Sequence, residues 1–377
     1  MQQFTADSLA AASAASDGPG RGRVLFAGTP EIAATCLRRL LSHGADIVAV
    51  LTRPDAPVGR RRRLTPSPVA QAAEAAGIPV IKAASIDSSV TAELTTAEAD
   101  LGVVVAYGAL LPEAALKVPA RGWVNLHYSQ LPAYRGAAPV PHALLAGERT
   151  TAATVFQLER GMDTGPVHGL CSYEIREATS AGTVLEDLTN LGASLLTVLL
   201  PSLLTGTSTP QAQRGTPSFA PKLTREDAFI DPSRPAAELV KRINATIPEP
   251  GAWTLNGDQR IKLGVARLHR TPSDPDAAQR LEAALAETAT GQVLSLPSTE
   301  DSESMSPLAG NHTSASREAG SVIAFRAGDG EAVVLSGVQP AGKTMINAVD
   351  WYRGLQSQVR LGGTEQTTST PTEEHHA

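Results

Sequence analysis

The stretch of sequence that decides the fold reads Trp123-Val124-Asn125-Leu126-His127-Tyr128-Ser129-Gln130-Leu131-Pro132. Its first six residues are typical of a strand, and Asn125 and His127 stand two positions apart within it. Side chains two apart in a strand lie on the same face, so one amide and one imidazole share a face here. In α/β proteins, ligands bind at the carboxyl ends of the parallel strands. We therefore expect the chemistry of the protein at this strand end.

Strands and helices alternate on the N-terminal side of this stretch. Gly28, in the first strand-to-helix turn, is followed by Thr29 as a candidate helix cap and Pro30 as a candidate first helical residue. Ser67-Pro68 is expected to open a second helix in the same way. The alternation predicts a doubly wound, mostly parallel, Rossmann-like sheet. Its expected strands are residues 23–28, 46–52, 80–81, 101–107 and 123–128.

Asp163 follows in a glycine-bounded turn, Gly161-Met162-Asp163-Thr164-Gly165, between two predicted strands at residues 150–158 and 169–175. A long apolar helix is expected at 180–204. Residues 205–218 are rich in Thr, Ser, Pro, Gln and Gly, and this composition favours an interdomain linker. The catalytic domain is thus expected to span residues 23–204.

The second domain is expected at residues 219–361. It begins with a predicted helix at 236–245, followed by short strands separated by Gly, Asp and Asn turns, and this pattern favours a small β-barrel of the OB-like type. Three segments have polar or Ala/Ser-rich compositions typical of disorder. They are residues 1–22, an insertion at about 296–320, and residues 362–377.

Composition excludes several classes of protein. The chain has 377 residues, enough for about two domains, and no apolar run approaches the roughly 18–20 residues of a membrane helix. Cys36 and Cys171 are isolated, so they give no metal-binding spacing and no disulfide framework, and we expect two buried thiols and no metal. The net charge of −6 argues against a uniformly basic protein, but Arg214–Arg270 holds ten basic and six acidic residues.

Asn125, His127 and Asp163 form the candidate catalytic set. Each one alone is more often a turn residue or a buried structural group, but together they provide an amide donor, an imidazole and a carboxylate. No serine or cysteine is evidently paired with a base. The set is therefore expected to stabilise an oxyanion and move protons without an enzyme nucleophile.

The run from Asn125 to Gly136, together with the turn that holds Asp163, resembles the signature of the folate-dependent formyltransferases. The resemblance implies that Asn125, His127 and Asp163 are catalytic and that the donor is 10-formyltetrahydrofolate. It also implies a folate-contacting loop made of Ser129, Gln130, Leu131 and Pro132. Protonated His127 and Asn125 would donate hydrogen bonds to the formyl oxygen, and Asp163 would orient His127.

Further matches favour a member that formylates the α-amine of methionine on initiator tRNA. They include Phe26-Ala27-Gly28-Thr29-Pro30 and Gly136-Ala137-Ala138-Pro139. In the family, the loop that contains Arg60, Arg61, Arg62 and Arg63 would enter the tRNA acceptor stem, where guanidinium groups neutralise phosphates and stack on unpaired bases. We expect a cytoplasmic monomer with no membrane partner.

Three other functions are weighed against this one. A formyltransferase acting on a small amine would use the same three residues but would need neither the arginine loop nor a basic second domain. A non-catalytic RNA-binding module would not need the three residues, and a dehydrogenase would need the G-x-G-x-x-G glycines that the Gly28 turn lacks. Two residues depart from the usual family pattern: Tyr128 replaces a small residue and Gln130 an apolar one.

Overall fold

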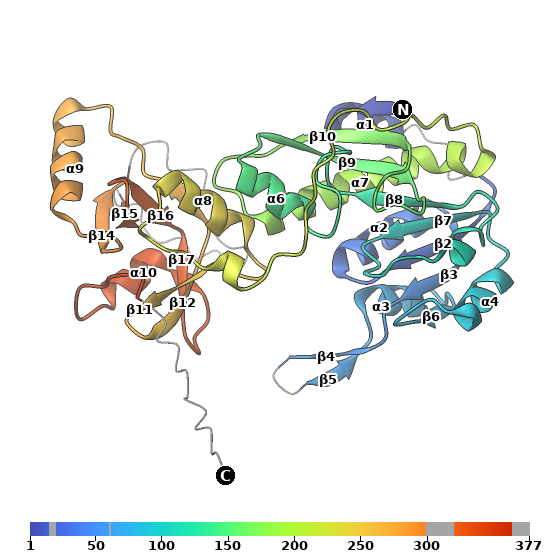
Figure 1. Cartoon of the computed structure of the whole chain (residues 1–377), viewed down its shortest axis with the longest axis horizontal. Helices are drawn as coiled ribbons and strands as arrows, with labels where there is room; N and C mark the ends of the chain where they lie inside the picture. The colour runs from blue at the N-terminus through green and yellow to red at the C-terminus, as the bar shows by residue number, and fades with distance from the viewer. Residues whose placement is uncertain (15–19, 60–61, 299–319, 364–377) are drawn as a thin grey trace, which may run out of the picture. The chain divides into compact units, whose positions relative to one another are not determined.

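The computed structural model describes residues 1–14, 20–59, 62–298 and 320–363. These residues form two compact units (Figure 1). The first unit comprises Met1–Ala143, Glu148–Ile175 and Thr183–Lys222. The second comprises Leu223–Ala377 together with two short pieces, Leu144–Gly147 and Arg176–Gly182.

An eight-stranded sheet forms the centre of the first unit, in the order β1-β10-β9-β8-β7-β2-β3-β6. All neighbouring strands are parallel except at the β8–β9 and β9–β10 pairs, which are antiparallel. The mostly parallel, Rossmann-like sheet is thus confirmed. The strands are β1 (Gln2–Phe4), β2 (Arg23–Gly28), β3 (Asp46–Thr52), β6 (Val80–Lys82), β7 (Leu101–Val105), β8 (Trp123–His127), β9 (Thr150–Gln157) and β10 (Val167–Glu174).

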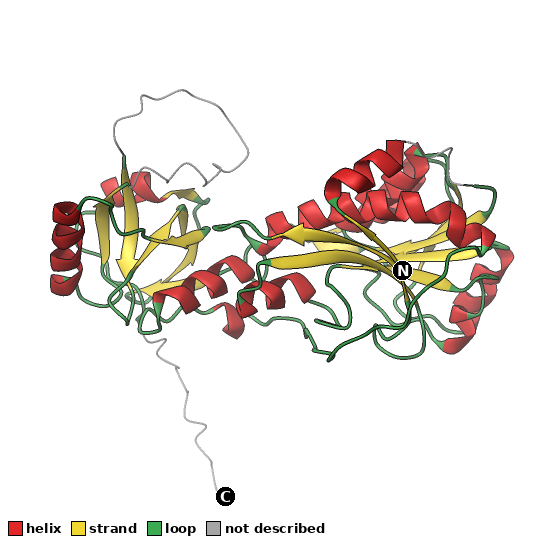
Figure 2. Ribbon diagram, turned by 90° about the horizontal axis from the view of Figure 1, so that it is seen from above, coloured by secondary structure: helices red, strands yellow, loops and turns green. Residues whose placement is uncertain are grey.

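Helices pack against this sheet (Figure 2). They are α1 (Ala6–Ala14), α2 (Glu31–Ser42), α3 (Pro68–Ala75), α4 (Ser88–Thr96), α5 (Glu113–Leu116), α6 (Pro139–Ala146) and α7 (Ala181–Thr205). A separate two-stranded ribbon, β4 (Ala56–Val58) and β5 (Arg63–Thr65), extends away from the sheet (Figure 1). α7 is long and apolar enough to cross a membrane, but it is largely buried within the protein.

The expected helix starts are partly confirmed. Ser67 caps α3, because its hydroxyl accepts a hydrogen bond from the Ala70 amide, and Pro68 occupies the first turn. The expectation for α2 was wrong by one position, since Pro30 is the N-cap. The Thr29 hydroxyl instead donates to the Tyr107 carbonyl and ties the turn after β2 to the segment after β7.

β8 is held in register by tight packing against β7. Gly102 lies opposite Trp123, and a Cβ at residue 102 would come within 2.1 Å of the indole ring. The indole nitrogen donates a 2.9 Å hydrogen bond to the Ala115 carbonyl, and Trp123 is fully buried. Because such close packing leaves the backbone of β8 little freedom to move, Asn125 and His127 are held in fixed positions.

The expectation of a disordered segment over residues 1–22 was wrong for residues 2–14, which form β1 and α1. β1 pairs with β10 and α1 buries Leu9, so this Ala/Ser-rich segment gains tertiary contacts that composition does not reveal. Residues 15–19 lie outside the described residues.

The segment 205–218, which we expected to be a linker, groups with the first unit. Gln211 exchanges two backbone hydrogen bonds with Val167. The Arg135 amide donates to the Ser218 carbonyl, the Arg135 carbonyl accepts from the Ala220 amide, and the Tyr134 amide donates to the Ser218 hydroxyl. The segment is thus an extended strap on the first unit, and its polar composition reflects an irregular backbone whose hydrogen-bond partners lie elsewhere in that unit.

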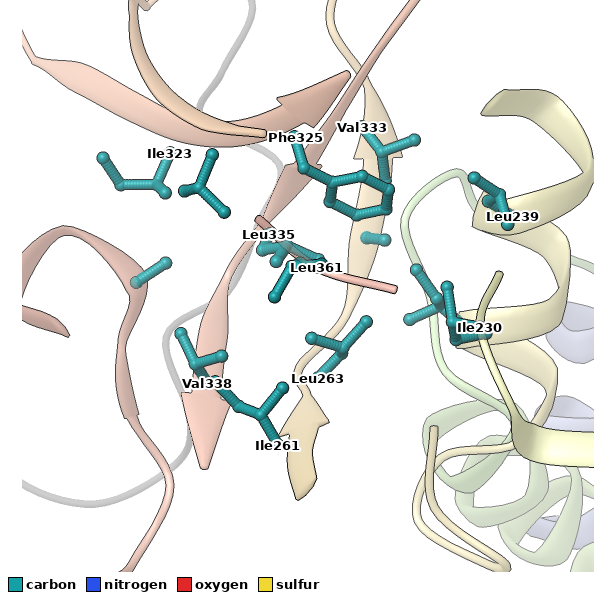
Figure 3. Close-up of a cluster of buried hydrophobic side chains, with 14 of the residues drawn as sticks. Ile230, Leu239, Ile261, Leu263, Ile323, Phe325, Val333, Leu335, Val338 and Leu361 are labelled. Carbon is teal, nitrogen blue, oxygen red and sulfur yellow. The ribbon is translucent and has the colours of Figure 1, made fainter. Parts of the chain in front are cut away.

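The second unit contains two four-stranded sheets. One has the order β11-β12-β17-β18 and the other β13-β16-β15-β14. The two share a core of buried aliphatic side chains and Phe325 (Figure 3). The strands are β11 (Trp253–Asn256), β12 (Gln259–Leu263), β13 (Ala266–Leu268), β14 (Val293–Pro297), β15 (Ser321–Arg326), β16 (Ala332–Leu335), β17 (Gly337–Pro340) and β18 (Ile346–Asn347).

The expected short strands and the helix α8 (Ala236–Ala245) are confirmed, whereas the closed barrel is not, because the strands form two separate sheets. A turn of 3-10 helix, η1 (Glu226–Ala228), and the helices α9 (Pro275–Glu287) and α10 (Ala348–Arg353) complete the unit. The expected disordered insertion begins too early, since residues 296 and 297 end β14. Its residues 299–319 and the tail from residue 364 lie outside the described residues.

Candidate active site

Asn125 and His127 occupy the last half of β8, as the sequence predicts. Asn125 is half-buried and lies opposite Phe156 of β9, while His127 ends the strand and is 6% exposed. The His127 ring lies edge-on to the Phe156 ring, with 6.3 Å between centroids. Nε2 of His127 is 2.9 Å from the Tyr134 carbonyl oxygen. Because a carbonyl only accepts, Nε2 carries the proton and Nδ1 presents its lone pair.

Asp163 lies in the turn between β9 and β10, and its side chain extends toward the His127 ring. Its Oδ2 lies 3.9 Å from Nδ1 of His127, and the same oxygen accepts a 2.7 Å hydrogen bond from the Gly136 amide. The Asp163 backbone has φ of 52°, a left-handed conformation that aspartate tolerates better than most residues. The structure therefore brings His127 and Asp163 together, with Asn125 on the same strand face as His127.

Gln213 holds this turn in place and was missed by the sequence analysis. Its side-chain amide donates to the carbonyls of Asp163 at 2.7 Å and Gly165 at 2.9 Å. Arg135 in turn donates to the Gln213 side-chain oxygen at 2.6 Å. A glutamine in a polar, turn-rich segment carries no sequence signal for such a role, because its partners lie 48 to 78 residues away in the chain.

Burial controls the electrostatics of His127. It lowers the pKa of the imidazole, while the nearby Asp163 carboxylate and the Tyr134 carbonyl act in the opposite direction. The net lowering favours a neutral ring near pH 7. The lowered pKa therefore disfavours the protonated His127 that the family resemblance implies as a donor to the formyl oxygen, because the charged ring would lose more hydration than its two partners return.

The loop after β8 is tightly constrained. The Ser129 hydroxyl donates to the Ala133 carbonyl at 2.6 Å, and the Ser129 carbonyl accepts from Thr154 at the same distance. Leu131 packs with Phe156 and Val167. Of the four predicted folate-contacting residues, Ser129, Leu131 and Pro132 are buried, and Gln130 is exposed. Gln130 therefore has the most accessible side chain of the four.

Tyr128 faces the protein core. Its hydroxyl accepts a 3.3 Å hydrogen bond from Thr189 of α7 and interacts with the thiol of Cys36 on α2. Burial raises the pKa of Cys36 to about 12 and also raises the pKa of Cys171. Both thiols are buried, as expected, and the unusual tyrosine fills space between two helices.

The predicted arginine loop joins β4 to β5. Arg62 and Arg63 are exposed, and Arg62 takes a left-handed turn conformation with φ of 47°. The neighbouring side chains of Val58 and Leu64 are 58% and 66% exposed. Arg60 and Arg61 lie outside the described residues.

Arginines also gather around an aromatic cluster in the second unit. The guanidinium carbons of Arg225 and Arg260 lie 5.2 and 4.3 Å from the centre of the Trp253 ring, and the Phe229 ring is 4.8 Å away. These residues line a pocket of about 530 Å³. In the part of the chain that the structure describes, no group of three His, Cys, Asp or Glu side chains is placed to hold a metal ion.

Comparison with known proteins gives a consistent family. A formyl transferase model matches residues 22–199, and a formyl transferase C-terminal domain model matches residues 222–356. The methionyl-tRNA formyltransferase of Paenarthrobacter aurescens is 44% identical over 90% of this chain and 99% of its own length. The chain belongs to the methionyl-tRNA formyltransferase family. A second member of this family, from Renibacterium salmoninarum, is 44% identical over 88% of this chain and 96% of its own.

Solved structures of more distant proteins share the fold. HypX from Aquifex aeolicus, in complex with tetrahydrofolic acid, aligns with a TM-score of 0.56 over 88% of this chain and 46% of its own, at 14% identity. The N-formyltransferase from Helicobacter canadensis aligns with a TM-score of 0.54 over 84% and 98% of the two chains, at 17% identity. At these identities the likeness supports the fold alone.

Proposed function

We propose that this formyltransferase moves the formyl group of 10-formyltetrahydrofolate to the α-amine of methionine on initiator tRNA. The observation that carries the proposal is the meeting of His127 and Asp163 beside Asn125 at the end of β8. It occurs in a chain 44% identical, over nearly its full length, to methionyl-tRNA formyltransferases.

His127 acts as the proton carrier. Its Nδ1 lone pair, on the side of Asp163, takes a proton from the attacking amine as the new carbon–nitrogen bond forms. The resulting imidazolium is stabilised by the Asp163 carboxylate and by the Tyr134 carbonyl, the two groups that favour its charged form. The same proton then passes to the departing donor nitrogen, so no proton is gained or lost overall.

Asn125 stabilises the negative charge that grows on the formyl oxygen. Among the described residues its side-chain amide has no hydrogen-bond partner, so its N–H groups are available to a substrate. A preorganised donor of this kind typically contributes about 3–4 kcal/mol to a transition state. Positioning of the two substrates accounts for further acceleration.

In this proposal the formyl donor binds against the loop of Ser129, Gln130, Leu131 and Pro132. This loop directly follows β8, which carries Asn125 and His127. In the same proposal, the arginine loop contacts the acceptor end of the tRNA. Its described members, Arg62 and Arg63, are exposed on a projecting ribbon, as an RNA contact requires. Arg225 and Arg260 of the second unit bind the RNA backbone by charge.

Three finer features complete the proposal. The two sheets of the second unit act as an OB-like barrel, supported by isolated bridges that pair Leu361 with Asn256 and Arg360 with Gln292 across their open edges. The enzyme works as a monomer. It is cytoplasmic, which accords with a translation substrate and with a buried α7.

A formyl-transfer assay tests this function. Purified protein is given 10-formyltetrahydrofolate with either methionyl initiator tRNA or free methionine as acceptor. Formylation of the charged tRNA should exceed formylation of free methionine by a large factor, because only the tRNA engages the arginines. Equal activity on the two acceptors would contradict an RNA substrate, and activity on neither would contradict formyl transfer itself.

A further inference from the structure

Residues 1–14 form structure that the family model does not include. The matched region begins at residue 22, whereas β1 and α1 precede it. The helix has its own start signal: the Thr5 hydroxyl accepts from the Ser8 amide, and the Ser8 hydroxyl accepts from the Thr5 amide. Reciprocal bonds of this kind stabilise a helix N-terminus. The segment we call the N-terminal arm, residues 1–14, is thus encoded as a folded element.

The N-terminal arm docks on the edge of the catalytic sheet. Gln2, Gln3 and Phe4 pair in parallel with Gly169, Leu170 and Cys171 of β10. Leu9 of α1 is 1% exposed, and this anchors the helix in the first unit. Strand pairing and burial of Leu9 are two independent attachments. Because β1 is the outermost strand of the sheet, the arm also covers backbone groups of β10 that would otherwise be an open edge.

The beginning of the arm reaches the side chains behind the active site. Met1 packs against the cluster of Leu131, Phe156 and Val167. Leu131 belongs to the predicted folate-contacting loop, and Phe156 pairs with Asn125 and touches the edge of the His127 ring. A single apolar cluster therefore connects the arm to the predicted folate-contacting loop and lies beside β8, the strand that carries Asn125 and His127.

We propose that the N-terminal arm is a positioning element for the formyl donor, acting through Met1 and Leu131. This inference rests on the proposed function, because it assumes that the Ser129–Pro132 loop binds the donor. Met1 of the arm extends the apolar cluster that contains Leu131, so that the loop is ordered before the donor arrives. Preordering a binding loop improves affinity by lowering the entropy lost on binding. The arm touches no reacting atom, so its effect falls on donor binding.

Two substitutions in the full-length chain isolate this effect. Leu9→Asp places a carboxylate at a buried position and releases α1, whereas Ala10→Asp adds the same charge at the exposed neighbouring position. We expect Leu9→Asp to raise the donor KM about five- to tenfold, while kcat at saturating donor and the tRNA KM stay close to wild type. Ala10→Asp should behave as wild type. Calorimetric binding of 5-formyltetrahydrofolate, without tRNA, should weaken by the same factor.

A variant lacking residues 2–14 removes the arm outright and should reproduce the Leu9→Asp result. An unchanged donor KM and folate affinity in this deletion would overturn the proposal. A purely structural role would instead lower kcat and weaken both substrates together as the thermal midpoint falls, and this outcome would also overturn it. If wild-type protein bound no folate and formylated no tRNA, the proposed function would have failed, which is a separate result.

Discussion

The chemistry of His127 depends on which of its ring nitrogens forms a hydrogen bond with the protein. Nε2 is tied to the Tyr134 carbonyl at 2.9 Å, which leaves Nδ1 on the side of Asp163. Burial keeps the ring neutral, so that it begins the reaction able to accept a proton. The carboxylate at 3.9 Å is near enough to stabilise the ring once charged, and the Gly136 amide fixes its direction. Orientation and burial together suit this histidine to the proposed role of a base.

His127→Ala and Asp163→Asn should each lower kcat by at least about a hundredfold, the typical contribution of a positioned acid or base. Asparagine keeps the shape of Asp163 and an oxygen for the Gly136 amide, so the loss would come from the charge. His142→Ala is a matched control, because His142 also contacts a backbone carbonyl at 2.9 Å but lies outside the site. Circular dichroism should show an unchanged fold. Near-normal turnover in either site variant would refute these roles.

The pH dependence of kcat/KM should reveal the neutral histidine. Because burial lowers the pKa of His127 below its ordinary 6.5, the active base form is present at neutral pH and is lost as pH falls through that lowered value. The rate should therefore show an inflection below 6.5 that belongs to His127. It is separate from the inflection of the substrate α-amine, whose ordinary pKa is about 7.7–8.0. The residual activity of His127→Ala should lack the His127 inflection. A wild-type rate that rises on acidification would show that the charged ring is the active form.

At the scale of elements, the sequence predicted best where apolar patterning is strong. β7 and β8 are buried throughout most of their length and match the expected strands. The arm at residues 1–14, the helix α9 and the strap at 205–218 were not expected. Their compositions are polar or rich in small residues, and their stability comes from partners distant in sequence. The same reason explains why Gln213 was missed, whereas Asn125, His127 and Asp163 stand in motifs that the sequence itself displays.

Gln213→Ala should reduce kcat about tenfold with little change in either KM. The substitution removes two hydrogen bonds to the turn that carries Asp163 and one from Arg135, each worth about 0.5–1.5 kcal/mol. Gln211→Ala is the control, because Gln211 contacts the same unit through its backbone and has an exposed side chain. Steady-state kinetics with both substrates varied would separate the effects. An unchanged kcat would mean that the turn keeps Asp163 in position without the hydrogen bonds of the Gln213 side chain.

At the scale of the whole molecule, charge is divided between two units of a chain with net charge −6. The first unit offers Arg62 and Arg63 on the projecting ribbon, and the second offers Arg225 and Arg260 beside Trp253. A protein of negative net charge can still bind RNA if its cations are concentrated where the phosphates run. In the proposed complex, each unit contributes its own share of counterion release to tRNA binding.

Because the arginines lie on two separate units, we predict that their contributions to the free energy of tRNA binding are additive. Arg62→Ala with Arg63→Ala, and Arg225→Ala with Arg260→Ala, should each weaken tRNA binding and make the salt dependence of log Kd shallower by about two. Since the two pairs lie on different units, their free-energy losses should add in the fourfold variant. Donor binding should be untouched, so that 5-formyltetrahydrofolate affinity serves as the control. Arg39→Ala with Arg149→Ala, which removes two other exposed arginines, should leave the slope unchanged. A fourfold variant no weaker than either double variant would mean that only one unit holds the RNA.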